Sequence, residues 1–271
     1  MSRISEKFEQ MKEQGRKGFI PFVTAGDPSM QASKEIVLTL ARSGADIIEL
    51  GVPFSDPMAD GPTIQASSMR ALENGATLPD ILKMVEEIRT VSDVPIVLFS
   101  YLNPLYRYGL EKLADDAAGA GVDGVLVTDL VDDEAREAAE MFSRRGIDMI
   151  PLVAPTTSDE RLESICAAAS GFIYAVSRAG VTGTRTETDS AAETLVRRAR
   201  RFTETPVAVG FGISTRRQID EVWEYADAAV VGSAIVAEIE RSAESGNVVE
   251  SVERLVRDLI PPAFAKDAAE I

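Results

Sequence analysis

Two carboxylates in the stretch "ELGVPFSDPMADGP" could carry acid–base chemistry. Glu49 ends the apolar run "IIEL", and Asp60 follows beyond a loop interrupted by prolines. A carboxyl group in apolar surroundings has a raised pKa, which suits a proton donor at neutral pH. The sequence therefore predicts that Glu49 is a catalytic acid and that Asp60 is a candidate second carboxylate.

Each acid also has a purely structural interpretation. Glu49 can be a buried acid satisfied by backbone groups or by a neighbouring arginine. Asp60 can equally cap a helix that starts near Thr63, because aspartate is a favoured N-cap residue. The spacing alone leaves both alternatives open.

The chain contains no histidine and a single cysteine. This composition excludes Ser-His-Asp and Cys-His nucleophilic schemes and makes a zinc site improbable. Acid–base chemistry would have to use carboxylates, with help from tyrosine or lysine. We expect no metal site.

Three glycine-containing segments could bind a phosphate group: 177–183 "SRAGVTG", 210–214 "GFGIS" and 232–236 "GSAIV". Glycines let backbone N–H groups approach an anion closely, and a helix N-terminus adds to the attraction. The alternative is that these glycines only make tight turns. Arg178 could assist the anion site or pair with an acid.

Short apolar runs alternate with segments of helical periodicity, which is typical of repeated β-α units and a parallel sheet. Eight such units predict a (β/α)8 TIM barrel of the α/β class, a single domain over 1–271 with an extra N-terminal helix at 4–14. An open doubly wound sheet is the second possibility. The expected strands are 18–24, 46–50, 95–100, 124–129, 148–154, 171–177, 206–211 and 228–233.

Helix-compatible segments lie at 29–45, 79–91, 133–146 and 158–170. Three junctions, "ARSGAD", "GAGVDG" and "SRRGIDM", share one design, in which a helix ends at glycine and an aspartate leads into the next strand. Glycine relieves the left-handed position at a helix C-terminus.

In such a barrel the active site lies at the C-terminal ends of the strands. Asp60 can reach the same rim from its long loop. Asp129 has the character of a loop acid rather than a catalyst, the tyrosines could line a pocket for an aromatic substrate or simply pack, and Cys166 is expected in the core. The residues that share this rim are Glu49, Tyr101, Asp129, Tyr174, Arg178, Gly212 and Ser233.

The formal net charge of −16 argues against nucleic-acid binding, which needs a basic surface. No apolar run approaches the ~20 residues of a membrane span, and no secretory signal is evident, so we expect a cytoplasmic protein without a membrane partner. The 28 basic residues comprise 21 Arg and 7 Lys. An acidic, lysine-poor composition suits a salt-rich cytoplasm.

The chain resembles the tryptophan synthase alpha subunit family over about residues 18–260. Six segments occur in the family order: "PFVTAGDP", "ELGVPFSDPMADGPTIQ", "NPLYRYG", "SRAGVTG", "GFGIS" and "GSAIV". The resemblance implies a cofactor-free lyase that cleaves indole-3-glycerol phosphate into indole and glyceraldehyde 3-phosphate. Met58 departs from the usual leucine, an exchange of similar volume that should be tolerated.

The resemblance also implies residue roles. Glu49 would be the acid at the indole C3 atom and also the base at the glycerol hydroxyl, and Asp60 would accept the indole N–H. Phe22, Tyr101, Asp129 and Tyr174 match positions around the indole and the carboxylates. Gly183, Gly212, Gly232 and Ser233 match the phosphate site, and Asp56 and Thr182 match a pair that joins two closing loops.

A partner is implied as well. The family binds a beta subunit that holds pyridoxal phosphate, in an α2β2 complex, and here Pro53, Asp56 and the loop from Asn103 correspond to the facing stretch. Two other functions remain to be weighed. The chain could be mainly an activating, phosphate-binding subunit, although its two acids argue against that. It could instead be another phosphate-sugar barrel, such as an isomerase or epimerase acting on a pentose phosphate, but those epimerases generally need a metal site with histidines, and the motif around Glu49 does not fit them.

Overall fold

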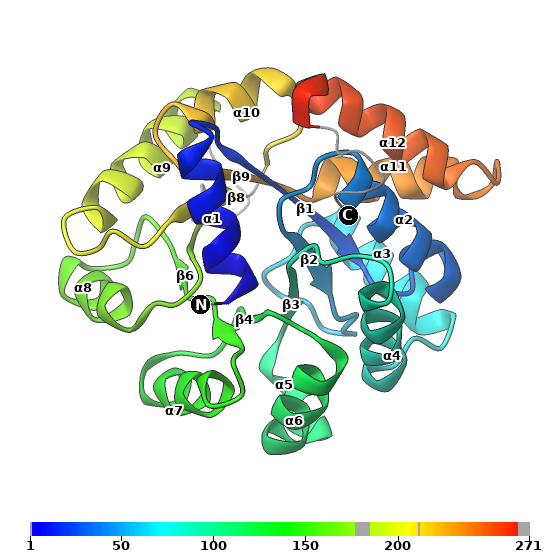
Figure 1. The fold of residues 1–271 in the computed structure, drawn as a ribbon, viewed down its shortest axis with the longest axis horizontal. Coiled ribbons are helices and arrows are strands. Elements are labelled where there is room, and N and C mark those ends of the chain that lie inside the picture. The colour runs from blue at the N-terminus through cyan, green and yellow to red at the C-terminus, as the bar shows by residue number, and fades with distance from the viewer. Residues whose placement is uncertain (1, 177–184, 211, 265–271) are drawn as a thin grey trace.

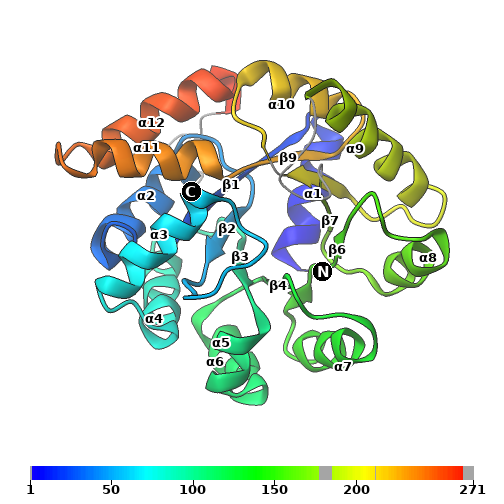
Figure 2. The ribbon, with the colours of Figure 1, turned by 180° about the vertical axis from the view of Figure 1, so that it is seen from behind.

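The computed structural model describes residues 2–176, 185–210 and 212–264. Within these ranges the strands curl into a barrel, and most of the helices form a ring around it (Figures 1 and 2). The expected (β/α)8 architecture with an extra N-terminal helix is therefore confirmed. A membrane-spanning helix is absent from the described ranges, because every helix there is too short or too polar.

All the strand pairs are parallel, and their order around the barrel follows the chain. The first strand pairs with the second on one side and with the last on the other. The strands are β1 (Gly18–Thr24), β2 (Ile48–Gly51), β3 (Ile96–Ser100), β4 (Gly124–Val127), β5 (Asp148–Met149), β6 (Leu152–Val153), β7 (Ile173–Val176), β8 (Val207–Gly210) and β9 (Ala228–Val231).

The barrel closes through the segment that the sequence predicts as one strand, 148–154. This segment forms two short strands because it changes partners in its middle: β5 pairs with β4, and β6 pairs with β7. The Ile150 N–H donates to Val125 O on one side, and Pro151 O accepts from the Tyr174 N–H on the other. An open doubly wound sheet would leave its two edges apart, so that alternative is wrong.

The predicted helices are confirmed, with ends shifted by a few residues. Hydroxyl side chains start several of them: Ser29 and Ser158 accept backbone N–H groups, and Thr215 forms a capping box with Gln218. The helices are α1 (Arg3–Glu13), α2 (Met30–Arg42), α3 (Pro62–Glu73), α4 (Leu78–Arg89), α5 (Leu102–Tyr108), α6 (Leu110–Ala120), α7 (Asp132–Ser143), α8 (Asp159–Ala168), α9 (Arg185–Ala199), α10 (Arg216–Trp223), α11 (Ser233–Ala243) and α12 (Val248–Leu259), followed by the 3-10 turn η1 (Pro262–Phe264).

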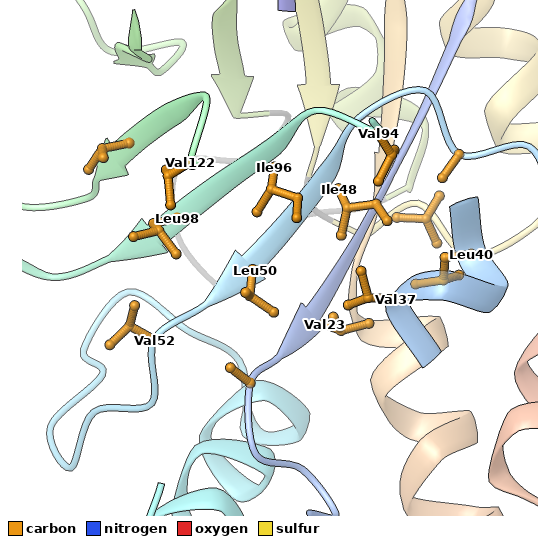
Figure 3. Packing of buried hydrophobic residues seen from close by; sticks show 14 of the residues in the cluster. Val23, Val37, Leu40, Ile48, Leu50, Val52, Val94, Ile96, Leu98 and Val122 are labelled. Atoms are coloured by element: carbon orange, nitrogen blue, oxygen red, sulfur yellow. The ribbon is translucent and has the colours of Figure 1, made fainter. Parts of the chain in front are cut away.

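Side chains along each strand alternate between the barrel interior and the helix layer. Around β2, Ile47 belongs to the interior cluster, whereas Ile48 and Leu50 belong to the outer one. Figure 3 shows Ile48 and Leu50 among outer-layer side chains that include Val37 of α2. The same alternation assigns Glu49 to the interior.

Helix α1 closes the end of the barrel at which the strands begin. Its Ile4, Phe8 and Met11 are buried in the interior cluster. The Phe8 ring lies 5.8 Å from the ring of Phe172. The open end of the barrel is therefore the one where the strands finish.

The glycine-to-aspartate junctions are confirmed as a repeated device at this closed end. Gly44, Gly121 and Gly146 all have positive φ. Two of the aspartates that follow bind the barrel wall: Asp46 accepts the Phe19 N–H at 3.0 Å, and Asp123 accepts the Ile96 N–H at 2.8 Å. These two carboxylates each join their own strand to the preceding one, whereas Asp148 accepts from the Ser2 hydroxyl of the N-terminal segment.

Candidate active site

Glu49 lies inside the barrel, in register with Phe22 of β1 and Val97 of β3. Only 1% of its surface is exposed. No described residue forms a hydrogen bond or ion pair with it, and its Oε1 atom is buried without a partner. The alternative of an acid satisfied by backbone groups or by an arginine is therefore not observed.

Burial raises the pKa of Glu49 well above its ordinary value of 4.5. Proton loss would leave an uncompensated charge in apolar surroundings, so burial favours the protonated form. In this state the side chain can donate a proton to a substrate atom inside the barrel.

Asp60 reaches the rim from the loop between β2 and α3. Its Oδ2 accepts a hydrogen bond of 3.0 Å from the Tyr101 hydroxyl. It does not cap α3: the N-cap residue is Gly61, and no side chain caps that helix. Burial raises the pKa of Asp60 to about 6, against the opposite effect of the Tyr101 hydrogen bond.

A small cavity of about 10 Å³, room for about one water molecule, lies between Asp60 and the barrel wall. Its walls are mostly apolar and aromatic. A larger groove of about 420 Å³, between α2 and the turn before α12, contains neither carboxylate and lies on the outside of the barrel. The lining of the small cavity is Phe22, Thr24, Gly51, Val52, Phe54, Pro57, Asp60, Ile64, Ser68, Phe99, Ser100 and Tyr101.

Aromatic rings continue from this cavity across the barrel. The ring of Phe99 lies 5.4 Å from that of Phe22 and 6.3 Å from that of Tyr174, both at steep angles. The ring of Phe54 lies 5.3 Å from that of Tyr101. Sequence reasoning missed Phe54 and Phe99. Phe99 could have been found, because it is two residues before Tyr101 and so points to the same side of β3.

Two glycines make room for these rings. A Cβ atom at Gly51 would lie 2.5 Å from the Phe22 ring, and one at Gly210 would lie 1.9 Å from the Tyr174 hydroxyl. The pKa of Tyr174 is raised by burial and by the nearby charges of Glu49 and Asp60. Gly210 of "GFGIS" therefore has a packing role beside the carboxylates.

Of the three expected phosphate segments, 232–236 and all of 210–214 except Phe211 fall within the described residues. Gly212 adopts a positive φ of 81° and is exposed. Gly232 is the N-cap residue of α11, and Ser233 is the first residue of that helix. Arg178, Thr182 and Gly183 lie outside the described residues, as does the expected contact between Asp56 and Thr182.

The remaining predicted residues lie around the same rim. Asp129 accepts the Leu102 N–H at 2.6 Å, so it holds the start of α5, in keeping with a loop acid. Asp56 and Asn103 are exposed, whereas Pro53 is buried.

Cys166 lies away from this rim and is buried in the core, as predicted. Among the residues that the structure describes, no three potential metal ligands cluster.

The geometry can be set beside known proteins. The family model described as "Tryptophan synthase alpha chain" matches residues 8–260. A tryptophan synthase alpha chain of Geobacter sulfurreducens is 49% identical over 262 residues, covering 96% of this chain and 99% of that one. One from Thermoanaerobacter sp. is 44% identical over 259 residues, covering 96% and 98%.

Solved structures show the same likeness. A crystal structure of tryptophan synthase subunit alpha from Legionella pneumophila has a TM-score of 0.89 at 33% identity, and 98% of each chain is covered. A chain of the tryptophan synthase complex from Pyrococcus furiosus has a TM-score of 0.80 at 41% identity, covering 89% of this chain and 97% of that one. From its sequence and its fold alike, this chain belongs to the tryptophan synthase alpha chain family.

Proposed function

We propose that Glu49 and Asp60 are the two carboxyl groups with which this lyase of tryptophan biosynthesis cleaves indole-3-glycerol phosphate into indole and glyceraldehyde 3-phosphate. The reaction is a reverse aldol cleavage of the carbon–carbon bond between the indole ring and the glycerol chain. The observation that carries the proposal is a buried carboxyl group, Glu49, whose Oε1 atom has no hydrogen-bond partner, with a second carboxyl, Asp60, in different surroundings and both close enough to raise the pKa of Tyr174.

The proton balance of the cleavage needs one group that both donates and accepts. Protonated Glu49 donates to the indole C3 atom, which turns the ring into a leaving group. The hydroxyl on the adjacent glycerol carbon then loses its proton as the bond to C3 breaks and the aldehyde forms. The electron pair of the broken bond returns to the ring, and the Glu49 carboxylate recovers its proton from the hydroxyl.

Asp60 has a different task in this scheme. Its ionised carboxylate accepts the indole N–H and stabilises the positive charge that develops on the ring after protonation at C3. With a pKa of about 6, Asp60 is mostly ionised at neutral pH, whereas burial favours the protonated form of Glu49. Two carboxyl groups in different environments thus take opposite roles.

The buried state of Glu49 also weighs against a purely activating subunit. An uncompensated carboxyl group inside a barrel costs stability, since its charged form is poorly solvated. A subunit that only binds a ligand and activates its partner would not need a buried carboxyl group that destabilises the fold.

The phosphate of the substrate would bind at Gly212, Gly232 and Ser233, with Gly183 from the neighbouring segment. The support is the N-terminus of α11, whose first turn begins at Ser233. The N–H groups of the first two residues, Ser233 and Ala234, have no acceptor within the helix and attract anions, whereas the Ile235 N–H already donates to Gly232 O.

We expect a beta subunit as partner, in an α2β2 complex. The Pyrococcus furiosus relative is part of a tryptophan synthase complex. Two large apolar side chains stand exposed in the segments expected to face the partner, Met58 at 93% and Tyr106 at 72%, near exposed Asp56 and Asn103. Pyridoxal phosphate would belong to the partner, because the cleavage described above balances without a cofactor.

The test is indole release from indole-3-glycerol phosphate by wild type and by Glu49→Gln, each with and without a beta subunit. We expect the variant to lose indole release by a factor of about 10² or more, as for the loss of a general acid. Glutamine has nearly the shape of protonated glutamate, so folding and binding of glycerol phosphate should persist.

The stability of the variant gives a control. The folded-state pKa of Glu49 is raised, so wild type loses stability as pH rises above the unfolded value of 4.5. Glutamine does not titrate, and Glu49→Gln should therefore be at least as stable as wild type at pH 7. Cleavage at the wild-type rate by a folded Glu49→Gln would exclude the proposed role. Inactive wild type even with its partner would favour the activating subunit.

A further inference from the structure

One side chain at the end of β3, that of Tyr101, contacts the loop that carries Asp60. Tyr101 follows directly after β3 and is the N-cap residue of α5, so its backbone is fixed by two elements. Asp129 adds a third constraint by accepting the N–H of the next residue, Leu102. The Tyr101 side chain is 6% exposed. Tyr101 is therefore a well-anchored side chain beside a long loop.

Tyr101 contacts this loop at three points. Its ring packs against Phe54, its hydroxyl lies 2.9 Å from the Ala59 nitrogen, and it lies 3.0 Å from Asp60 Oδ2. The Ala59 N–H can only donate, so the hydroxyl oxygen accepts there. The single hydroxyl proton is then directed to Asp60.

This arrangement divides the two oxygens of Asp60 between two tasks. Oδ2 is occupied by Tyr101, whereas no described residue donates to Oδ1. The Oδ1 atom is thus the acceptor available to a substrate N–H. The hydroxyl of Tyr101 is turned toward the loop and already has both a donor and an acceptor partner.

We propose that Tyr101 is a positioning residue for the cleavage: it acts through Asp60, by holding the loop and the carboxylate in the geometry that accepts the indole N–H. This inference rests on the function proposed above. It differs from the expectation that Tyr101 serves to line the indole pocket.

The hydrogen bond has a consequence for the pH profile. Burial raises the pKa of Asp60, and the Tyr101 hydroxyl lowers it by stabilising the ionised form. Removing the hydroxyl should therefore raise the pKa of Asp60 further. If ionised Asp60 is the active form, the acid limb of the kcat profile must move to higher pH.

The test is the pH dependence of kcat and KM for indole release, from about pH 5 to about pH 9, in wild type and Tyr101→Phe. The variant keeps the ring contact with Phe54 and loses only the hydroxyl. We expect the midpoint of the acid limb to move to higher pH by roughly one unit, so that kcat at a fixed pH on that limb falls roughly tenfold. A hydrogen bond to a charged group has about this strength. Near pH 9, where Asp60 is ionised in both enzymes, the loss of kcat that remains in the variant measures the positioning of the loop and carboxylate by the Tyr101 hydroxyl.

Tyr225→Phe is the matched control. Tyr225 lies in the turn before β9, at the opposite end of the strands from Asp60. The same hydroxyl is lost there, and the profile should not move. Carbon-13 NMR of the Asp60 carboxyl in the free protein gives a second reading that does not depend on turnover, and its titration should shift upward in Tyr101→Phe only.

Asp60→Asn separates the two proposals. Suppose that wild type has an acid limb and that Asp60→Asn is inactive, as the proposed function requires. If Tyr101→Phe then changes only KM, and leaves both the acid limb and the NMR titration of Asp60 in place, Tyr101 merely lines the pocket and this inference is overturned. If Asp60→Asn cleaves the substrate as fast as wild type, the proposed function of Asp60 itself fails.

Discussion

At the scale of single residues, the site depends on how differently two carboxyl groups are surrounded. Glu49 has apolar neighbours and no polar partner among the described residues. Asp60 lies at the edge of the barrel and has a phenol hydroxyl beside it. The same chemical group thus has a different environment in each place, as the proposed roles of proton donor and charge stabiliser require.

Gly51 also matters at this scale, because a side chain there would occupy the space that the Phe22 ring fills. We predict that Gly51→Ala lowers kcat/KM and destabilises the fold by about 1–3 kcal/mol, the usual effect of overpacking. The added Cβ would lie 2.5 Å from the Phe22 ring and push it into the substrate pocket. Urea unfolding and steady-state kinetics measure the two effects.

Gly119→Ala is the control for that prediction. Gly119 lies in α6, where an added Cβ meets nothing within 4 Å. This variant should be more stable by about 0.5–1 kcal/mol, because alanine loses less backbone entropy in a helix. If Gly51→Ala matched Gly119→Ala in both measurements, the close approach of Phe22 to the backbone would have no functional meaning.

At the scale of elements, buried aspartates join the strands at the closed end. Asp123, 4% exposed, accepts the Ile96 N–H and pairs with Arg89 at 2.6 Å and with Arg3 of α1 at 2.9 Å. Burial lowers the pKa of Arg89, so this guanidinium depends on its acidic partner. One carboxylate thus connects β3, β4, α4 and α1.

We predict that Asp123→Ala destabilises the protein by about 3–5 kcal/mol, since it leaves the buried Arg89 charge without its carboxylate and the Ile96 N–H without its acceptor. The midpoint of urea unfolding measures this loss. Arg257→Ala removes only an exposed pair with Glu253 and should leave the midpoint nearly unchanged.

The acid limb of the pH profile should be the same in both variants while they are folded, because Asp123 lies at the other end of the strands from Asp60. A shift of that limb in Asp123→Ala would show that the two ends are coupled.

At the scale of the whole molecule, charge is the unusual property. Ion pairs at the surface mostly use arginine, as in the contacts of Arg145 with Glu111 and Asp115. These pairs leave a formal excess of 16 negative charges over the chain. Self-repulsion of this kind destabilises a compact state and is weakened by salt.

We therefore predict that the melting temperature rises by several degrees between about 10 mM and about 1 M potassium chloride, as the screening length falls from about 30 Å to about 3 Å. Differential scanning calorimetry at pH 7 measures it. An unchanged melting temperature would contradict adaptation to a salt-rich cytoplasm, and the cytoplasmic location stays a prediction that needs its own experiment.

The sequence by itself determined the barrel and its candidate acids. Strand and helix positions follow from local periodicity, and the glycine-to-aspartate junctions are local motifs, so they could be predicted from neighbouring residues. Where a segment depends on two partners, prediction was incomplete: 148–154 divides into β5 and β6 because its two ends pair with different strands.

Only the tertiary structure decided how the two acids are surrounded. The sequence left a structural alternative open for both Glu49 and Asp60. Neighbouring residues cannot show that Glu49 Oε1 lacks a hydrogen-bond partner or that Tyr101 is the partner of Asp60. The hydroxyl that holds Asp60 comes from Tyr101, 41 residues away, and the ring that requires Gly51 comes from Phe22 on another strand. The register of parallel strands brings these groups together. Protonation state and ring packing depend on the distances between such groups, so only the folded barrel fixes them.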